Sequence, residues 1–123
     1  MEITSAISKV REHRKSEKFA EVNFMVDSSA IYSLVPGKIL DQTDIEPYKK
    51  MSFSLAGATT LNRKKCSGYF EYDGERGPAP VIYGGDGDKA LLGATTLTSR
   101  GLVLNPFTRT LHPVRMLMNK LKK

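Results

Sequence analysis

The sequence is poor in the residues that bind metals or form disulfides. It has one cysteine, Cys66, and two histidines, His13 and His112, which lie too far apart to form a ligand pair. A single cysteine cannot form a disulfide within the chain and is typical of a reducing compartment. The N-terminus shows no basic segment followed by an apolar core, so we expect no signal peptide. These absences predict a cytoplasmic protein without a metal site.

Long hydrophobic runs are absent as well. No apolar stretch approaches the roughly 18 residues that a membrane-spanning helix needs, so we expect no membrane partner. Residues 84–89 (GGDGDK) are rich in glycine, but the lysine is not followed by the Ser or Thr of a phosphate-binding loop. The same segment lacks the other ligands of an EF-hand loop, so it predicts a turn.

Positive charge predominates, with 19 Lys and Arg against 13 Asp and Glu and a net charge of +6. It gathers in residues 11–18, 63–65 and 120–123, which are predicted turn, hairpin and tail positions. Such clusters can bind nucleic acids. No aromatic residues alternate with them as on a surface that binds single strands, so we favour a solubilising role and expect no nucleic-acid partner.

The apolar pattern predicts a mainly β domain. Residues 19–26 alternate and place Ala20, Val22, Phe24 and Val26 on one face of a strand. With 123 residues we expect one domain, 1–123, whose residues 115–123 form a basic C-terminal tail. The other predicted strands are 3–10, 31–35, 51–55, 59–63, 69–72, 77–83, 90–92, 102–104 and 111–114; the predicted helices are 36–43 and 95–100, the second ended by Gly101, and Asp73-Gly74 is a predicted hairpin turn.

Asp27 has a setting that no other aspartate of the sequence shares. It directly follows the predicted strand 19–26 and precedes Ser28, Ser29 and Ala30, whereas the other aspartates lie among polar, glycine or turn residues. A carboxylate at the end of a strand is held in place by the strand and exposed to a substrate by the turn that follows. The alternative is an ordinary turn or cap residue. If Asp27 does chemistry, a partner carboxylate must come from a second copy of the chain.

Three features follow one another in an order typical of a known family. A strand ends in Asp27-Ser28-Ser29-Ala30, a hairpin over residues 55–61 has the small-residue tip Ala56-Gly57-Ala58, and Leu91-Leu92-Gly93-Ala94 precedes a short helix and a closing strand. This order resembles the retropepsin-like aspartic proteases, especially their small single-domain cellular and prokaryotic members. The likeness is clearest over residues 18–114.

The resemblance implies a retropepsin-like closed β-barrel that acts as a homodimer. Asp27 of each subunit would share a proton with its twin and activate the water that attacks a peptide bond. Ser28 would lock the two motifs across the dimer, and Ala56-Gly57-Ala58 would be a flap over the substrate. Leu91-Leu92-Gly93 would pack beneath the motif. The implied substrate is a peptide or unfolded protein, and no cofactor is needed.

Ser29 departs from the family pattern, which reads Asp-Thr/Ser-Gly. Serine adds a Cβ atom and a hydroxyl that can donate to the carboxylate, lower its pKa and weaken the shared-proton state. One alternative to an endopeptidase is therefore a catalytically silent dimerisation or peptide-binding module with the same fold. A second alternative is a basic β-barrel that binds nucleic acid.

Overall fold

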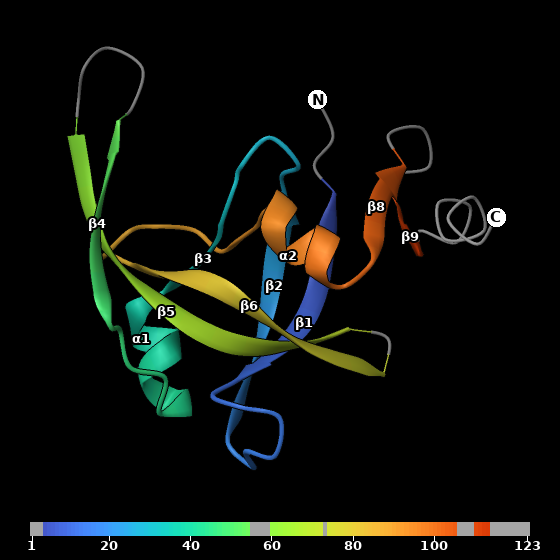
Figure 1. Cartoon of the computed structure of the whole chain (residues 1–123), viewed down its shortest axis with the longest axis horizontal. Coiled ribbons are helices and arrows are strands. Elements are labelled where there is room, and N and C mark those ends of the chain that lie inside the picture. The colour runs from blue at the N-terminus through green and yellow to red at the C-terminus, as the bar shows by residue number, and fades with distance from the viewer. Residues whose placement is uncertain (1–3, 55–59, 73, 106–109, 114–123) are drawn as a thin grey trace, which may run out of the picture.

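The computed structural model describes residues 4–54, 60–72, 74–105 and 110–113, and it is mainly β (Figure 1). A seven-stranded sheet has the order β1-β2-β7-β3-β6-β5-β4, and β8 and β9 form a separate two-stranded sheet. The elements are β1 (Ser5–Arg11), β2 (Phe19–Val26), β3 (Ser33–Pro36), α1 (Gly37–Leu40), a 3-10 turn (Asp41–Thr43), β4 (Lys49–Ser54), β5 (Thr60–Tyr72), β6 (Glu75–Gly84), β7 (Leu91–Leu92), α2 (Ala94–Ser99), β8 (Leu102–Asn105) and β9 (Thr110–Pro113).

The large sheet mixes parallel and antiparallel pairs. The hairpins β1–β2, β4–β5 and β5–β6 are antiparallel, whereas β2–β7 and β3–β6 are parallel. β1 also pairs with β5, with Val10 opposite Phe70, so the strand pairings return to the first strand. This arrangement brings the ends of β2, β3 and β7, which are remote in sequence, next to one another.

The core is filled by the inward faces of β1, β2, β5 and β6. In β2 the predicted alternation is confirmed, because Ala20, Val22, Phe24 and Val26 are all buried. The Phe24 ring packs against Phe70 of β5, with ring centres 5.9 Å apart. This packing fixes one face of β2 in the core. The backbone of Asp27, which directly follows the strand, is therefore also held in place.

The prediction of two separate strands at 59–63 and 69–72 was wrong, because β5 is one continuous strand of 13 residues. Residues 64–68 look polar and contain a glycine, yet Cys66 is fully buried and Gly68 faces inward in the same alternation. A Cβ atom on Gly68 would lie 3.3 Å from Ile45 Cδ1 and 3.5 Å from the Arg11 carbonyl oxygen. The lack of a side chain at Gly68 therefore allows Ile45 and the backbone of Arg11 to pack closely against β5.

Gly101 ends helix α2 as predicted. Its φ of 66° lies in the left-handed region, and its N–H donates to the Thr98 carbonyl at 3.0 Å. The predicted helix at 36–43 is divided into α1 and a 3-10 turn, with Pro36 as the N-cap residue of α1. The Asp73-Gly74 hairpin is confirmed by the pairing of Tyr72 with Glu75.

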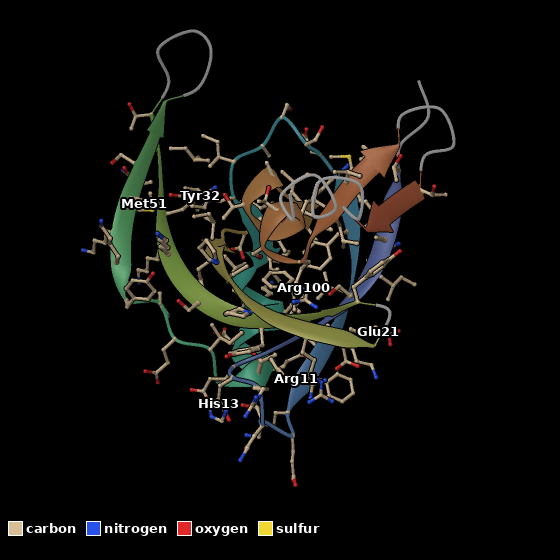
Figure 2. The ribbon with its side chains drawn as sticks, turned by 45° about the vertical axis from the view of Figure 1, so that its right-hand side comes forward. Arg11, His13, Glu21, Tyr32, Met51 and Arg100 are labelled. Atoms are coloured by element: carbon tan, nitrogen blue, oxygen red, sulfur yellow. The ribbon has the colours of Figure 1, made fainter. Side chains whose placement is uncertain are left out.

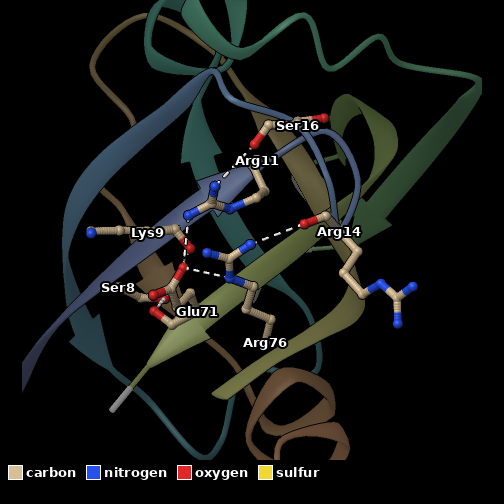
Figure 3. Close-up of polar contacts among 7 residues, drawn as sticks. All are labelled: Ser8, Lys9, Arg11, Arg14, Ser16, Glu71 and Arg76. Carbon is tan, nitrogen blue, oxygen red and sulfur yellow. Dashed lines mark hydrogen bonds and ion pairs between the residues drawn. The ribbon is translucent and has the colours of Figure 1, made fainter. Parts of the chain in front are cut away.

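A partly buried ion pair fastens β1 to β5 (Figure 3). Arg11, 5% exposed, donates to Glu71 Oε1 at 2.7 Å, and Arg76 Nε lies 2.9 Å from the same oxygen. The two arginines also donate to the carbonyl oxygens of Ser16 and Arg14, both at 3.0 Å. The Glu71 carboxylate thus joins β1, β5 and β6, and the two arginines connect the turn after β1 to this cluster.

Replacing Glu71 with alanine is expected to lower the free energy of unfolding by about 3 kcal/mol, because the buried Arg11 guanidinium loses its counter-charge. Urea denaturation measures the change. Glu12→Ala is the matched control, since Glu12 is exposed and its one ion pair among the described residues is with the exposed His13; we expect about 0.5 kcal/mol or less. Equal effects of the two substitutions would show that the Glu71 cluster does not stabilise the fold.

Candidate functional site

Asp27 directly follows β2, as the sequence predicts, and lies half-buried in a tight turn. Its N–H donates to the Leu92 carbonyl at 3.0 Å, and its own carbonyl accepts the Ala30 N–H at 3.1 Å. The pairing of Val26 with Leu92 brings β7 alongside this turn. Asp27 is therefore held from both sides by backbone hydrogen bonds while its carboxylate remains accessible.

The Asp27 carboxylate accepts two hydrogen bonds from Ser29. The Ser29 hydroxyl donates to Oδ1 at 2.5 Å, and the Ser29 N–H donates to the same oxygen at 3.0 Å. Both bonds favour the ionised carboxylate, the hydroxyl more than the N–H, and together they hold the pKa of Asp27 below its usual value against the opposing effect of partial burial. Ser28 is exposed, and within the described residues it donates no hydrogen bond to this carboxylate.

The structure brings Leu91-Leu92-Gly93 against the segment that follows Asp27. Leu91 pairs with Met25 on one side and with Leu34 on the other, and Leu92 is buried. A Cβ atom on Gly93 would lie 2.5 Å from the carbonyl carbon and oxygen of Tyr32, so only glycine permits this approach. The two segments are thus in direct backbone contact.

Helix α2 holds the same segment through its first two N–H groups. Ala94 donates to the Ala30 carbonyl at 2.7 Å, and Thr95 donates to the Ile31 carbonyl at 2.9 Å. These carbonyls satisfy donors that have no partner inside the helix. The helix start therefore fixes the path of the chain immediately after the Asp27 turn.

Two supporting residues were not singled out from the sequence. The buried hydroxyls of Ser33 and Thr96 hydrogen-bond to each other, and Ser33 Oγ also accepts the Gly93 N–H at 2.9 Å. They connect β3, α2 and the turn before α2. The sequence signal is weak, since Ser and Thr are common, and only the pairing of distant strands puts the two side by side.

The hairpin predicted around residues 55–61 is present as β4 and β5, with Ser54 opposite Thr60. Figure 1 shows this hairpin projecting from the molecule on the side opposite β8 and β9. The predicted tip residues Ala56, Gly57 and Ala58 lie outside the described residues. At the base of the hairpin the Lys65 ammonium lies 5.1 Å from the centre of the Tyr32 ring, a cation–π contact with the segment after Asp27.

Other candidate chemistries find little support in the described residues. Burial raises the pKa of the Cys66 thiol to about 11, which makes it a poor nucleophile. Within the part of the chain described, no three His, Cys, Asp or Glu side chains gather where they could hold a metal ion. Nor do those residues include a helix long and apolar enough to cross a membrane.

Comparison with known proteins gives a likeness in structure and none in sequence. No family model matches the chain, and no curated protein matches it. Among solved structures, the protease of EIAV complexed with the inhibitor HBY-793 is similar, with a TM-score of 0.59 and 13% sequence identity. The match covers 81% of this chain and 89% of that protease. The chain therefore has a mainly β fold similar to that of a retroviral protease, which confirms the predicted resemblance at the level of the fold.

Proposed function

We propose that the chain is an aspartic endopeptidase that acts as a homodimer, with one Asp27 from each subunit. The observation that carries this proposal is the position of Asp27. It ends a core strand in a turn fixed by β7 and α2, its carboxylate is accessible, and the fold around it is similar to that of a retroviral protease. On this proposal residues 1–123 form one retropepsin-like domain, and the β1–β5 pairing supports a closed barrel.

Each proposed role follows from ordinary carboxylate chemistry. Two carboxylates a few ångströms apart cannot both remain charged, so they share one proton across the two-fold axis. The ionised partner accepts a proton from a water molecule, which attacks the carbonyl carbon of the peptide bond. The protonated partner donates to the carbonyl oxygen, and the resulting tetrahedral intermediate collapses as the amine leaves with a proton.

Further residues have supporting roles in this proposal. Ser28 joins the two motifs across the dimer, and Ala56-Gly57-Ala58 closes over the peptide as a flap. Leu91-Leu92-Gly93 supports the motif from beneath, which agrees with its backbone contacts to the Asp27 turn. The reaction needs only water and the peptide or unfolded protein as reactants.

The contact between Ser29 and Asp27 favours a second candidate, a silent dimerisation or peptide-binding module. Both Ser29 donors stabilise the ionised carboxylate, whereas the proposed mechanism needs one proton to stay on the pair. Two such serines in a dimer bias the pair toward the doubly charged state. A module of this kind would dimerise and bind peptides without cleaving them.

Cleavage of an unfolded protein between about pH 4 and 6 tests the proposal. We expect fragments to appear, and a statine-type inhibitor to abolish them at a stoichiometry of one inhibitor per two chains. Sedimentation should show a dimer under the same conditions. Dimers that bind the inhibitor but release no fragments would favour the silent module, and a monomer would overturn both candidates.

Ser29→Ala is expected to shift the pH profile of kcat/KM toward higher pH. The substitution removes the hydroxyl donor, so the Asp27 carboxylate loses stabilisation of its charged form and its pKa rises. The pair then acquires its shared proton at a higher pH, and both limbs of the bell-shaped profile move in that direction. Ser29→Thr keeps a hydroxyl and should retain the lower profile. A shift equal in both variants would show that the hydroxyl does not set the proton affinity of the pair.

A further inference from the structure

The base of the β4–β5 hairpin concentrates positive charge. The paired segments 49–54 and 60–65 contain five lysine and arginine residues and no acidic residue. Their register places Lys49 opposite Lys65 and Lys50 opposite Lys64. Like charges directly opposite each other on a sheet destabilise it. These four residues, named the lysine ladder below, therefore lower the stability of the hairpin that carries them.

The protein neutralises little of this charge. Asp88 binds Arg63 through two hydrogen bonds, at 2.7 and 3.2 Å. Lys65 lies over the Tyr32 ring. Within the described residues, none of the four lysines of the ladder forms an ion pair with a carboxylate. The ladder is thus available to an acidic partner.

β4 is also an edge strand. It is the last strand in the order of the large sheet, and within the described chain it pairs only with β5. Figure 2 shows β4, which carries Met51, at the margin of the molecule with β5 between it and the rest of the sheet. An edge strand presents backbone N–H and C=O groups that can pair with another extended chain.

Edge protection alone does not explain the lysine ladder. Lysines on an edge strand prevent aggregation, which accounts for Lys49 and Lys50. Lys64 and Lys65 lie on β5, which is flanked by β4 on one side and β6 on the other and has no free edge at these positions. A neutral or acidic residue at these two positions would leave the edge protected and the hairpin more stable.

We propose that the free edge of β4 and the lysine ladder bind an extended acidic segment of a polypeptide. The segment adds to β4 as a further strand, so its side chains alternate between the two faces of the hairpin. Aspartate or glutamate side chains on one face pair with Lys49 and Lys65, and those on the other with Lys50 and Lys64. A polypeptide fits better than a nucleic acid because the sheet edge offers backbone pairing that a nucleic acid does not use.

A groove that includes part of the lysine ladder can accommodate the acidic side chains of the bound segment. It has a volume of about 410 Å³ and is formed by residues of both strands: Lys50, Met51, Ser52, Asn62, Arg63 and Lys64. The surface does not include Asp27, so binding there does not depend on the proposed peptidase activity. On a peptidase, it would recruit substrates that carry an acidic segment.

The test is direct binding, measured by fluorescence anisotropy with the full chain. The probe is a peptide of about ten residues with alternating glutamate and valine. We expect this peptide to bind, its glutamine counterpart to bind at least about tenfold more weakly, and added salt to weaken binding. Peptides N-methylated at alternate residues should bind weakly in the register that blocks pairing with β4 and normally in the other register.

Substitutions assign the binding to the ladder. Lys49→Gln/Lys50→Gln should weaken binding of the glutamate peptide by about tenfold, since two charge pairs are lost. Lys38→Gln/Lys89→Gln removes the same charge from exposed positions elsewhere and should leave binding unchanged. Lys64→Glu should weaken peptide binding and yet raise the Tm, because it turns a repulsive pair with Lys50 into an attractive one.

Three results would overturn this proposal. The first is equal affinity for the glutamate and glutamine peptides. The second is equal binding of the two N-methylated registers, which would exclude pairing with the sheet edge. The third is tighter binding of a single-stranded oligonucleotide with the same dependence on the lysine ladder, which would assign the surface to nucleic acid. Loss of peptidase activity affects none of these measurements.

Discussion

Asp27→Asn is expected to reduce peptide cleavage at least about a thousandfold while leaving the chain folded. The amide cannot accept a proton from water, so the proposed dyad loses its base. The amide side chain keeps an oxygen that can accept both hydrogen bonds from Ser29, and the position is half-exposed, so the free energy of unfolding should change by about 1 kcal/mol or less. Initial rates on an unfolded substrate and urea denaturation measure the two quantities. Asp86→Asn makes the same chemical change at an exposed loop position and should leave both unchanged.

Mixing the wild-type chain with the Asp27→Asn chain tests whether two subunits share one site. If the subunits exchange freely, an equal mixture contains about one quarter wild-type homodimers. Activity per total chain should therefore fall to about one quarter of the wild-type value, because mixed dimers have only one catalytic carboxylate. A fall to about one half would mean that each chain works alone, and the proposed dyad would be wrong.

The sequence predicts best where local pattern and tertiary structure agree. The limits of β2 follow from its strict alternation, and this alternation in turn identifies Asp27 as a residue at the end of a strand. Gly101 and the turn at Asp73-Gly74 follow from local backbone requirements. Each of these features depends on residues that are near one another in the chain.

Features that depend on the pairing of distant segments could not be predicted from the sequence. The continuity of β5 relies on β6, which pairs with residues 64–68 as well as with 69–72, so the polar composition of residues 64–68 was misleading. The hydrogen bond between Ser33 and Thr96 needs β3, β7 and α2 to meet. The lysine ladder likewise appears only when the register of β4 and β5 is known. In each case the deciding interaction joins residues whose partners cannot be identified from local pattern.

Gly93→Ala is expected to disrupt the site from outside the catalytic motif. The added Cβ would lie 2.5 Å from the carbonyl carbon and oxygen of Tyr32 and 3.0 Å from the Ala30 carbonyl oxygen. These are backbone atoms, which cannot rotate away as a side chain can. Relief of the clash must separate β7 and α2 from the segment after Asp27, which weakens the hydrogen bonds from Ala94 and Thr95. We expect the free energy of unfolding to fall by about 3 kcal/mol.

Gly93→Ala should also reduce cleavage by the chains that remain folded. Because these backbone bonds set the path of the chain after Asp27, cleavage should fall at least about tenfold at a temperature where the variant is still folded. Gly85→Ala is the control, since the three atoms nearest to its new Cβ, at 3.2 to 3.3 Å, belong to the Arg63 side chain and not to the backbone. Denaturation in urea and cleavage rates on the folded protein separate the two effects. If both variants behave alike, the close approach of Gly93 to Tyr32 does not support the Asp27 turn.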